Sequence, residues 1–165
     1  MVMTQNNLEN TLNGLSFDEA KKLLQKEGRK LERIAKSEWR KYLNSYSPKE
    51  YIRTGRSEKA IKLNNVKQVS SDELGIELTW QNDLVYHDSV LYKKGYTSKN
   101  KKGHSVMLIS RGWHSVKLEK KLKRRIYRFT YYQGSGYIDN VIKRYKAVKD
   151  KNVYLELQWS GAFTR

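Results

Sequence analysis

The chain has 165 residues and a formal net charge of +17, with 34 Lys and Arg against 17 Asp and Glu. The absence of cysteine excludes disulfides, zinc–thiolate sites and thiol nucleophiles, and the 12% of aromatic residues argue against outright disorder. No apolar run approaches the roughly 20 residues of a membrane span, and the polar N-terminus is unlike a signal peptide, so we expect one domain inside the cell, without membrane contact.

The first predicted element is a long amphipathic helix over about 17–46. Ser16 and Glu19 have the spacing of a capping box, which is typical of a helix start, and Pro48 ends the run. Gly28 interrupts the helix and would allow a bend. Apolar side chains recur at steps near three, four and seven, while Lys and Arg fill the other face. The stripe comprises Phe17, Ala20, Leu24, Leu31, Ala35, Tyr42 and Tyr46, widened by Leu23, Ile34, Trp39 and Leu43.

The elements after this helix predict a small, mostly antiparallel sheet. Segments 60–63 and 66–69 alternate in part and 75–80 alternates cleanly, which indicates a hairpin or neighbouring strands; 153–159 predicts a closing strand. A second helix before the last strand is predicted from one apolar face, formed by Tyr137, Ile138, Val141, Ile142 and Tyr145. The predicted fold class is α+β, with the long N-terminal helix packed on the sheet.

The predicted organisation is a flexible arm over 1–15 and a single domain over 16–165, with the sheet and a basic segment in 51–165. Within 93–103 five lysines occur without an acid, which predicts a mobile basic loop. These lysines are Lys93, Lys94, Lys99, Lys101 and Lys102.

Segment 111–130 carries eight basic residues and one acid. Such density is tolerated most easily beside nucleic acid or an acidic protein surface. We expect a short helix to about Arg125 and an extended segment after it. Three interpretations stay open: phosphate contact with base stacking, a protein interface, and a solvated face. The candidate patch facing DNA or an acidic partner comprises Lys117, Lys120, Lys121, Lys123, Arg124, Arg125, Tyr127 and Arg128.

Catalytic and metal sites are not predicted. The three histidines, His87, His104 and His114, lie in expected loops without a second ligand at helical spacing, so we expect them at the surface. A ribonuclease-like site would need a general acid and base around a phosphodiester. Tyr127, Arg128, His114 and Glu119 offer such groups, although their spacing does not demand a site. We therefore predict no catalytic residue, no metal and no cofactor.

The run Gln-Gly-Ser-Gly at 133–136 has two interpretations. Before a helix it would offer backbone amides to a phosphate, but it lacks the lysine and spacing of a Walker loop. We therefore expect a structural turn that uses Gly134 and Gly136.

Two motifs resemble tailed-phage minor tail proteins of the tail-component or tail-completion family. The first is Arg-Phe-Thr-Tyr-Tyr-Gln-Gly-Ser-Gly-Tyr-Ile-Asp-Asn-Val-Ile at 128–142, and the second is Tyr-Ile-Arg-Thr-Gly at 51–55. Members begin with a long helix and end with a late helix and a closing strand, as 153–161 does here. The resemblance is spread over most of 16–161, whereas the 93–102 loop and the long basic segment have no counterpart in it.

The resemblance implies a structural virion protein at the head–tail junction, or neck, assembled in the host cytoplasm, and no enzyme. It implies a ring of copies, such as a hexamer, that contacts the portal or connector and the tail-tube or terminator proteins. Non-specific contact with phage DNA is also expected. The wide stripe of the long helix predicts packing between adjacent subunits. The alternative is a nucleic-acid-binding or ribonuclease-like accessory protein that uses the basic patch.

Overall fold

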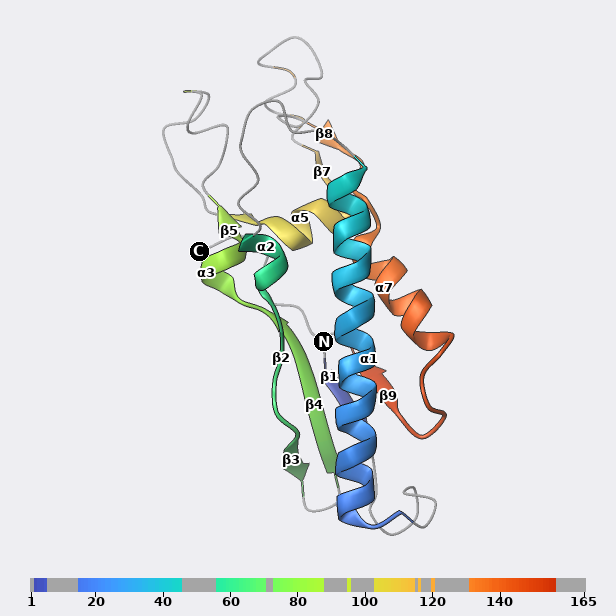
Figure 1. Ribbon diagram of the computed structural model, residues 1–165. Coiled ribbons are helices and arrows are strands. Elements are labelled where there is room, and N and C mark those ends of the chain that lie inside the picture. The colour runs from blue at the N-terminus through green and yellow to red at the C-terminus, as the bar shows by residue number, and fades with distance from the viewer. Residues whose placement is uncertain are drawn as a thin grey trace.

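A long helix lies along one face of a five-stranded antiparallel sheet and a second helix lies against the first (Figure 1), which confirms the α+β prediction. The computed structural model describes residues 2–5, 15–45, 56–70, 73–87, 95, 103–114, 116, 120 and 131–156. The second helix precedes the last strand, as predicted.

Helix α1 spans Phe17–Asn44, close to the predicted 17–46. The predicted capping box is formed, because the Ser16 hydroxyl accepts the Glu19 N–H at 3.4 Å and the Glu19 carboxylate accepts the Ser16 N–H at 2.8 Å. The Ser16 N–H and hydroxyl each donate to the Glu19 carboxylate at 2.8 Å, and these two hydrogen bonds lower the pKa of Glu19. At the other end, Ser45 donates its N–H to carbonyls of the last turn.

The apolar stripe of α1 is covered within the chain. Its central members, each at most 1% exposed, are Ala20, Leu24, Leu31, Ala35 and Trp39. Strands β2 (Ile61–Leu63) and β4 (Glu73–Trp80) cover one part of the stripe, and helix α7 (Tyr137–Lys146) covers another. The prediction that this stripe packs between subunits was wrong for these residues. The stripe is wide because it packs against both the sheet and α7 of the same chain.

Gly28 lies where α1 approaches the sheet most closely, and the helix continues through it. A Cβ at this position would lie 2.7 Å from Cδ1 of Ile76 and 3.0 Å from Cδ1 of Leu63. Glycine therefore lets the helix approach the sheet, whereas the sequence had suggested a bend.

The sheet has the strand order β2-β4-β1-β9, and β3 pairs with β4 beside β2. All pairs are antiparallel. Alternate residues of β4, namely Leu74, Ile76 and Leu78, are buried in the core. The remaining strands are β1 (Val2–Gln5), β3 (Lys67–Ser70) and β9 (Tyr154–Glu156).

Strand β1 lies between β4 and β9, with Met3 opposite both Ile76 and Leu155. The prediction of a flexible arm over 1–15 was wrong for this strand; residues 6–14 lie outside the described part of the chain. Four residues give too short a pattern to indicate a strand. The partners of β1 come from distant segments, so its pairing is a tertiary effect that local propensity does not report.

The shorter elements lie toward the C-terminal end of α1 (Figure 1). They are α2 (Arg56–Lys59), α3 (Asn82–Val85), β5 (Tyr86–His87), β6 (Gly103–His104), α5 (Ser105–Arg111), β7 (Trp113–His114) and β8 (Tyr131–Tyr132). Strands β5 and β6 form one two-stranded ribbon, and β7 and β8 form another. The Trp113 and Tyr132 rings of the second ribbon pack with centroids 4.9 Å apart.

Helix α7 carries the predicted apolar face, and Tyr137, Ile138, Val141 and Tyr145 are each at most 2% exposed. The Tyr137 hydroxyl donates to the Ala35 carbonyl of α1 at 3.0 Å. Burial raises the pKa of Tyr137 above its usual range. The face therefore anchors α7 through both apolar packing and a buried hydrogen bond.

A buried carboxylate also joins α7 to α1. Glu27 is 1% exposed and accepts hydrogen bonds from the Tyr145 hydroxyl at 2.9 Å and from Nζ of Lys30 at 2.5 Å. The Asp150 N–H lies 3.3 Å from the same carboxylate. Burial raises the pKa of Tyr145, and its hydrogen bond to Glu27 raises it further. Each polar group of this cluster thus has a partner, as buried polar groups require.

Candidate functional site

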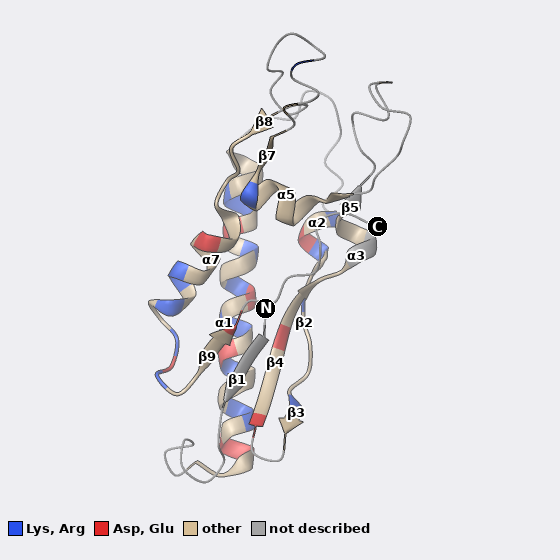
Figure 2. Cartoon of the chain, turned by 180° about the vertical axis from the view of Figure 1, so that it is seen from behind, with Lys and Arg blue, Asp and Glu red and all other residues tan. Residues whose placement is uncertain are grey.

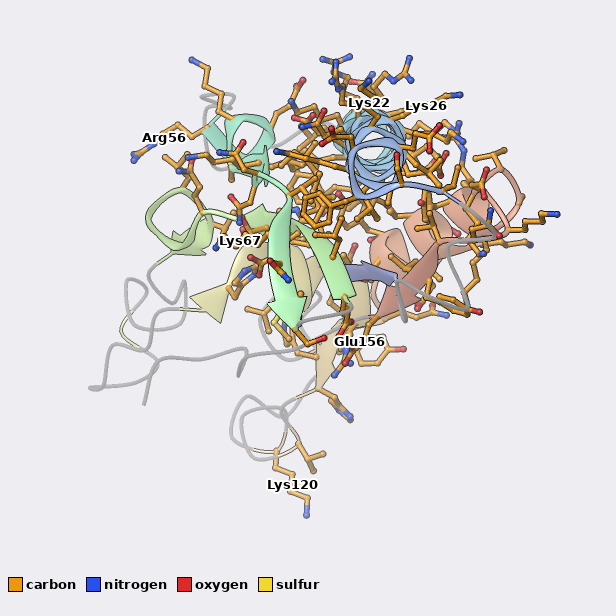
Figure 3. All side chains as sticks on the ribbon, turned by 90° about the horizontal axis from the view of Figure 1, so that it is seen from below. Lys22, Lys26, Arg56, Lys67, Lys120 and Glu156 are labelled. Atoms are coloured by element: carbon orange, nitrogen blue, oxygen red, sulfur yellow. The ribbon has the colours of Figure 1, made fainter. Side chains whose placement is uncertain are left out.

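The predicted basic patch lies almost wholly outside the described residues. Of its eight members Lys120 is described, and it is exposed. In Figure 3 it projects from the opposite side of the molecule to Lys22 and Lys26 of α1. The patch stays a prediction for the other members, which are Lys117, Lys121, Lys123, Arg124, Arg125, Tyr127 and Arg128.

Most residues of the predicted basic loop and of the ribonuclease-like group also lie outside the described part of the chain. The five loop lysines lie outside the described residues, as do Glu119, Tyr127 and Arg128. His114 is exposed on β7, and its ring meets that of Tyr131 edge-on at 5.5 Å. The alternative function therefore stays a prediction, and so does the expectation that the chain is not an enzyme.

The predicted glycine turn is confirmed. Gly134 and Gly136 have positive φ angles of 93° and 65°, and Gly136 is the N-cap residue of α7. The Ser135 N–H donates to the Ile109 carbonyl at 2.8 Å, and the Gly136 N–H donates to the Ser110 carbonyl at 3.0 Å. Both amides already donate hydrogen bonds to carbonyls of α5, so they are not available to a phosphate. The interpretation as a structural turn therefore holds.

The same turn packs tightly against the end of α5. A Cβ at Gly134 would lie 2.7 Å from both the Arg111 carbonyl carbon and the Ser110 carbonyl oxygen. A Cβ at Gly112 would lie 2.1 Å from the Tyr132 carbonyl oxygen. Two backbone segments therefore meet where side chains do not fit. Gly112 was not predicted as part of this contact, because its partner is distant in sequence.

His104 is buried, so the prediction of surface histidines was wrong at this position. It precedes α5, and its Nδ1 accepts the Met107 N–H at 3.3 Å. This hydrogen bond needs an unprotonated Nδ1. Burial lowers the pKa of His104 below its ordinary value near 6.5. In the described part of the chain no three His, Asp or Glu side chains are grouped to hold a metal ion.

We expect the stability of the fold to decrease as the pH falls below about 6.5. The folded protein holds His104 neutral, whereas the unfolded chain binds a proton there, so protonation favours unfolding. Glu19 and Glu38, whose pKa values are lowered, titrate below this window. Thermal melting between pH 8 and 5 measures the effect. The variant His104→Asn, which retains a capping side chain, should melt with a weaker pH dependence; an unchanged dependence would contradict this assignment.

Helix α1 also carries a basic surface, which the sequence pattern indicates only as the polar face of the helix. Six basic residues recur at steps of four and three, directly opposite the buried stripe. We call them the basic line of α1: Lys22, Lys26, Arg29, Arg33, Lys36 and Arg40. Figure 2 shows basic residues along the length of α1, and Figure 3 shows Lys22 and Lys26 pointing away from the sheet. The period of the apolar stripe, applied to the charges, would have found this line.

Two members of the basic line have carboxylate partners. Lys36 pairs with Glu32 at 2.7 Å and Arg40 pairs with Glu58 at 2.5 Å. The other four form no ion pair with a carboxylate of the described residues. These four are Lys22, Lys26, Arg29 and Arg33, and together with Gln25 they line a shallow hollow on the helix surface.

The row of like charges on α1 lowers the stability of the helix. Like charges three or four residues apart destabilise a helix by a few tenths of a kcal/mol per pair. The basic line therefore persists against local helix stability, as functional surfaces often do.

Comparisons with known proteins find no matching family model, no matching curated protein and no matching solved structure. The likeness to tail-completion proteins therefore rests on the sequence motifs. None of the described helices has the length and apolar character of a membrane span.

Proposed function

We propose that this chain is a structural protein of a tailed-phage virion that joins head and tail by forming a ring of identical subunits. The proposal combines the resemblance carried by segments 51–55 and 128–142 with one observation, that the described helices cover one face of the sheet. The helices α1 and α7 form one layer, and among the described elements no helix covers the other sheet face (Figures 1 and 2). A sheet of this kind has a face and edges that a neighbouring subunit can cover.

The two edges of the sheet differ in chemistry. Strand β3 carries Lys67 and Val69, and Val69 is 56% exposed. Strand β9, at the edge of the sheet opposite β2 and β3, carries Tyr154 and Glu156, and Tyr154 is 57% exposed. A ring made by head-to-tail contacts needs two different surfaces on each subunit. The edges supply an apolar side chain and a charge of opposite sign on each side, which favours contact between unlike edges.

Strand β3 also has features that limit uncontrolled pairing. Its register with β4 shifts between Gln68 and Ser70, which leaves Val69 at an irregularity, and Lys67 adds a charge. Bulges and lysines on edge strands discourage open-ended sheet growth. A subunit with such an edge suits a protein that stays separate until it meets its place of assembly.

We expect Val69→Asp and Tyr154→Asp to fold normally and to fail in assembly. The first variant replaces an exposed apolar side chain and the second an exposed aromatic one, and surface substitutions usually change stability by within about 0.5 kcal/mol. Loss of an aromatic interface anchor costs about 2 kcal/mol per contact, or roughly 30-fold in association. The measurement is plating of a phage that lacks the gene, with each variant supplied in trans.

The matched control is Val148→Asp, because Val148 is 51% exposed but lies in the turn after α7. We expect this variant to restore plating. If both edge variants restored plating as well as Val148→Asp does, the edges would not be the subunit contacts.

A further inference from the structure

We infer that the basic line of α1 is a binding surface for the phosphate backbone of double-stranded DNA, independent of base sequence. Lys120, the described member of the predicted patch, projects from the opposite side of the molecule (Figure 3). The inference does not depend on the head–tail assignment, because it uses the contacts and charges of α1 alone.

The line has the length and spacing for several phosphates. Steps of four and three residues place successive charges about 4.5–6 Å apart along the helix, and the whole line is about 27 Å long. Each DNA strand carries one phosphate per about 3.4 Å of duplex axis, so the line spans roughly eight base pairs. The helix is held by its opposite face on the sheet and on α7, so the charges are presented on a rigid support.

Four of the six charges of the line are available to a ligand, since Lys36 and Arg40 pair with carboxylates. Lys22, Lys26, Arg29 and Arg33 are exposed and form no ion pair with a carboxylate of the described residues. They are consecutive members of the line, and Gln25 beside them adds a further hydrogen-bond donor. Lys and Arg are the side chains that most often contact phosphate oxygens, and they release counterions when they do.

The composition of the surface decides between partner classes. The centre of a protein–protein interface is enriched in aromatic and apolar side chains and depleted of lysine. The basic line has neither apolar nor aromatic members. Binding of single-stranded nucleic acid relies on aromatic side chains that stack on bases, which the line also lacks. A rigid row of cations therefore fits a duplex backbone better than an acidic protein or a single strand.

The test compares two variants of the full chain with equal charge. One replaces Lys22, Lys26, Arg29 and Arg33 by Gln, and the control replaces four exposed lysines elsewhere by Gln, namely Lys59, Lys143, Lys146 and Lys151. Fluorescence anisotropy with a short labelled duplex of arbitrary sequence, at several salt concentrations, gives the affinity and its salt dependence. Melting curves check folding, and the line variant should melt at or above the temperature of the parent because repulsion is relieved.

We expect the line variant to lose at least about 100-fold in affinity at low salt and to reduce the slope of log K against log salt by about 3 to 4. The control should change the slope by less than about 1. Lys22→Arg with Lys26→Arg should retain binding, because the charges remain. Equal losses in both Gln variants, or an unchanged slope in the line variant, would overturn the inference. So would tighter binding of the parent to a single strand, or loss of binding to an acidic virion protein without loss of DNA binding.

The isolated chain and DNA suffice for this test. Its failure leaves the head–tail proposal standing, and failure of the edge variants leaves the DNA surface standing.

Discussion

The variant Gly134→Ala should lose about 3 kcal/mol or more of unfolding free energy, whereas Gly136→Ala should lose about 1 kcal/mol. Both glycines have positive φ, so both substitutions strain the backbone and restrict the unfolded chain alike. The space around them differs. A Cβ at Gly134 would lie within 2.8 Å of three backbone atoms of 110–112, whereas at Gly136 no heavy atom lies within 4 Å.

Backbone atoms cannot rotate away as side chains do, so Gly134→Ala must separate the turn from the end of α5. We expect it to weaken the hydrogen bonds that Ser135 and Gly136 donate to α5. Urea unfolding of the two variants measures the difference, and near-ultraviolet circular dichroism reports the Trp113–Tyr132 packing nearby. Equal losses in both variants would show that the close approach of the two segments is not a real constraint.

The variant Glu27→Ala should destabilise the fold by about 3 kcal/mol, near the lower end for a broken buried ion pair. It removes the acceptor of the buried Tyr145 hydroxyl and the partner of Lys30 together. The estimate stays at the lower end because Lys30 is partly exposed and also donates to the Val148 carbonyl. For a domain of this size such a loss lowers the melting temperature by about 6–12 °C.

The matched control is Glu32→Ala, five residues along the same helix. Glu32 pairs with Lys36 at 2.7 Å, but both side chains are more exposed than Glu27. A pair of this kind contributes less than about 0.5 kcal/mol. Glu27→Gln keeps an acceptor for Tyr145 and should fall between the two. A loss for Glu27→Ala no larger than for Glu32→Ala would remove Glu27 from the account of how α7 is anchored.

The elements predicted well are those whose signals are local. The capping box at Ser16 and the apolar period behind it locate α1 to within two residues at its C-terminal end. The alternation in β4 and the glycines before α7 are also local signals. In each case the pattern of a single segment determines which face is buried, so no knowledge of its partner is needed.

The features that were missed depend on distant partners. Strand β1 has no pattern of its own and is defined by β4 and β9. His104 is buried by the tertiary fold, and Gly28 marks the approach to Ile76 rather than a bend. Fewer of the predicted site residues than of the predicted elements can be compared with the structure, because most of the predicted patch lies outside the described residues. The basic line of α1 was readable from the charge spacing, because Lys and Arg recur on the helix face opposite the apolar stripe.

The most direct test of the head–tail proposal is electron microscopy of a lysate from the parent phage or prophage with this gene deleted. We expect filled heads and separate, unattached tails, with joined virions restored when the gene is supplied in trans. Normally joined virions in the deletion lysate would contradict the proposal.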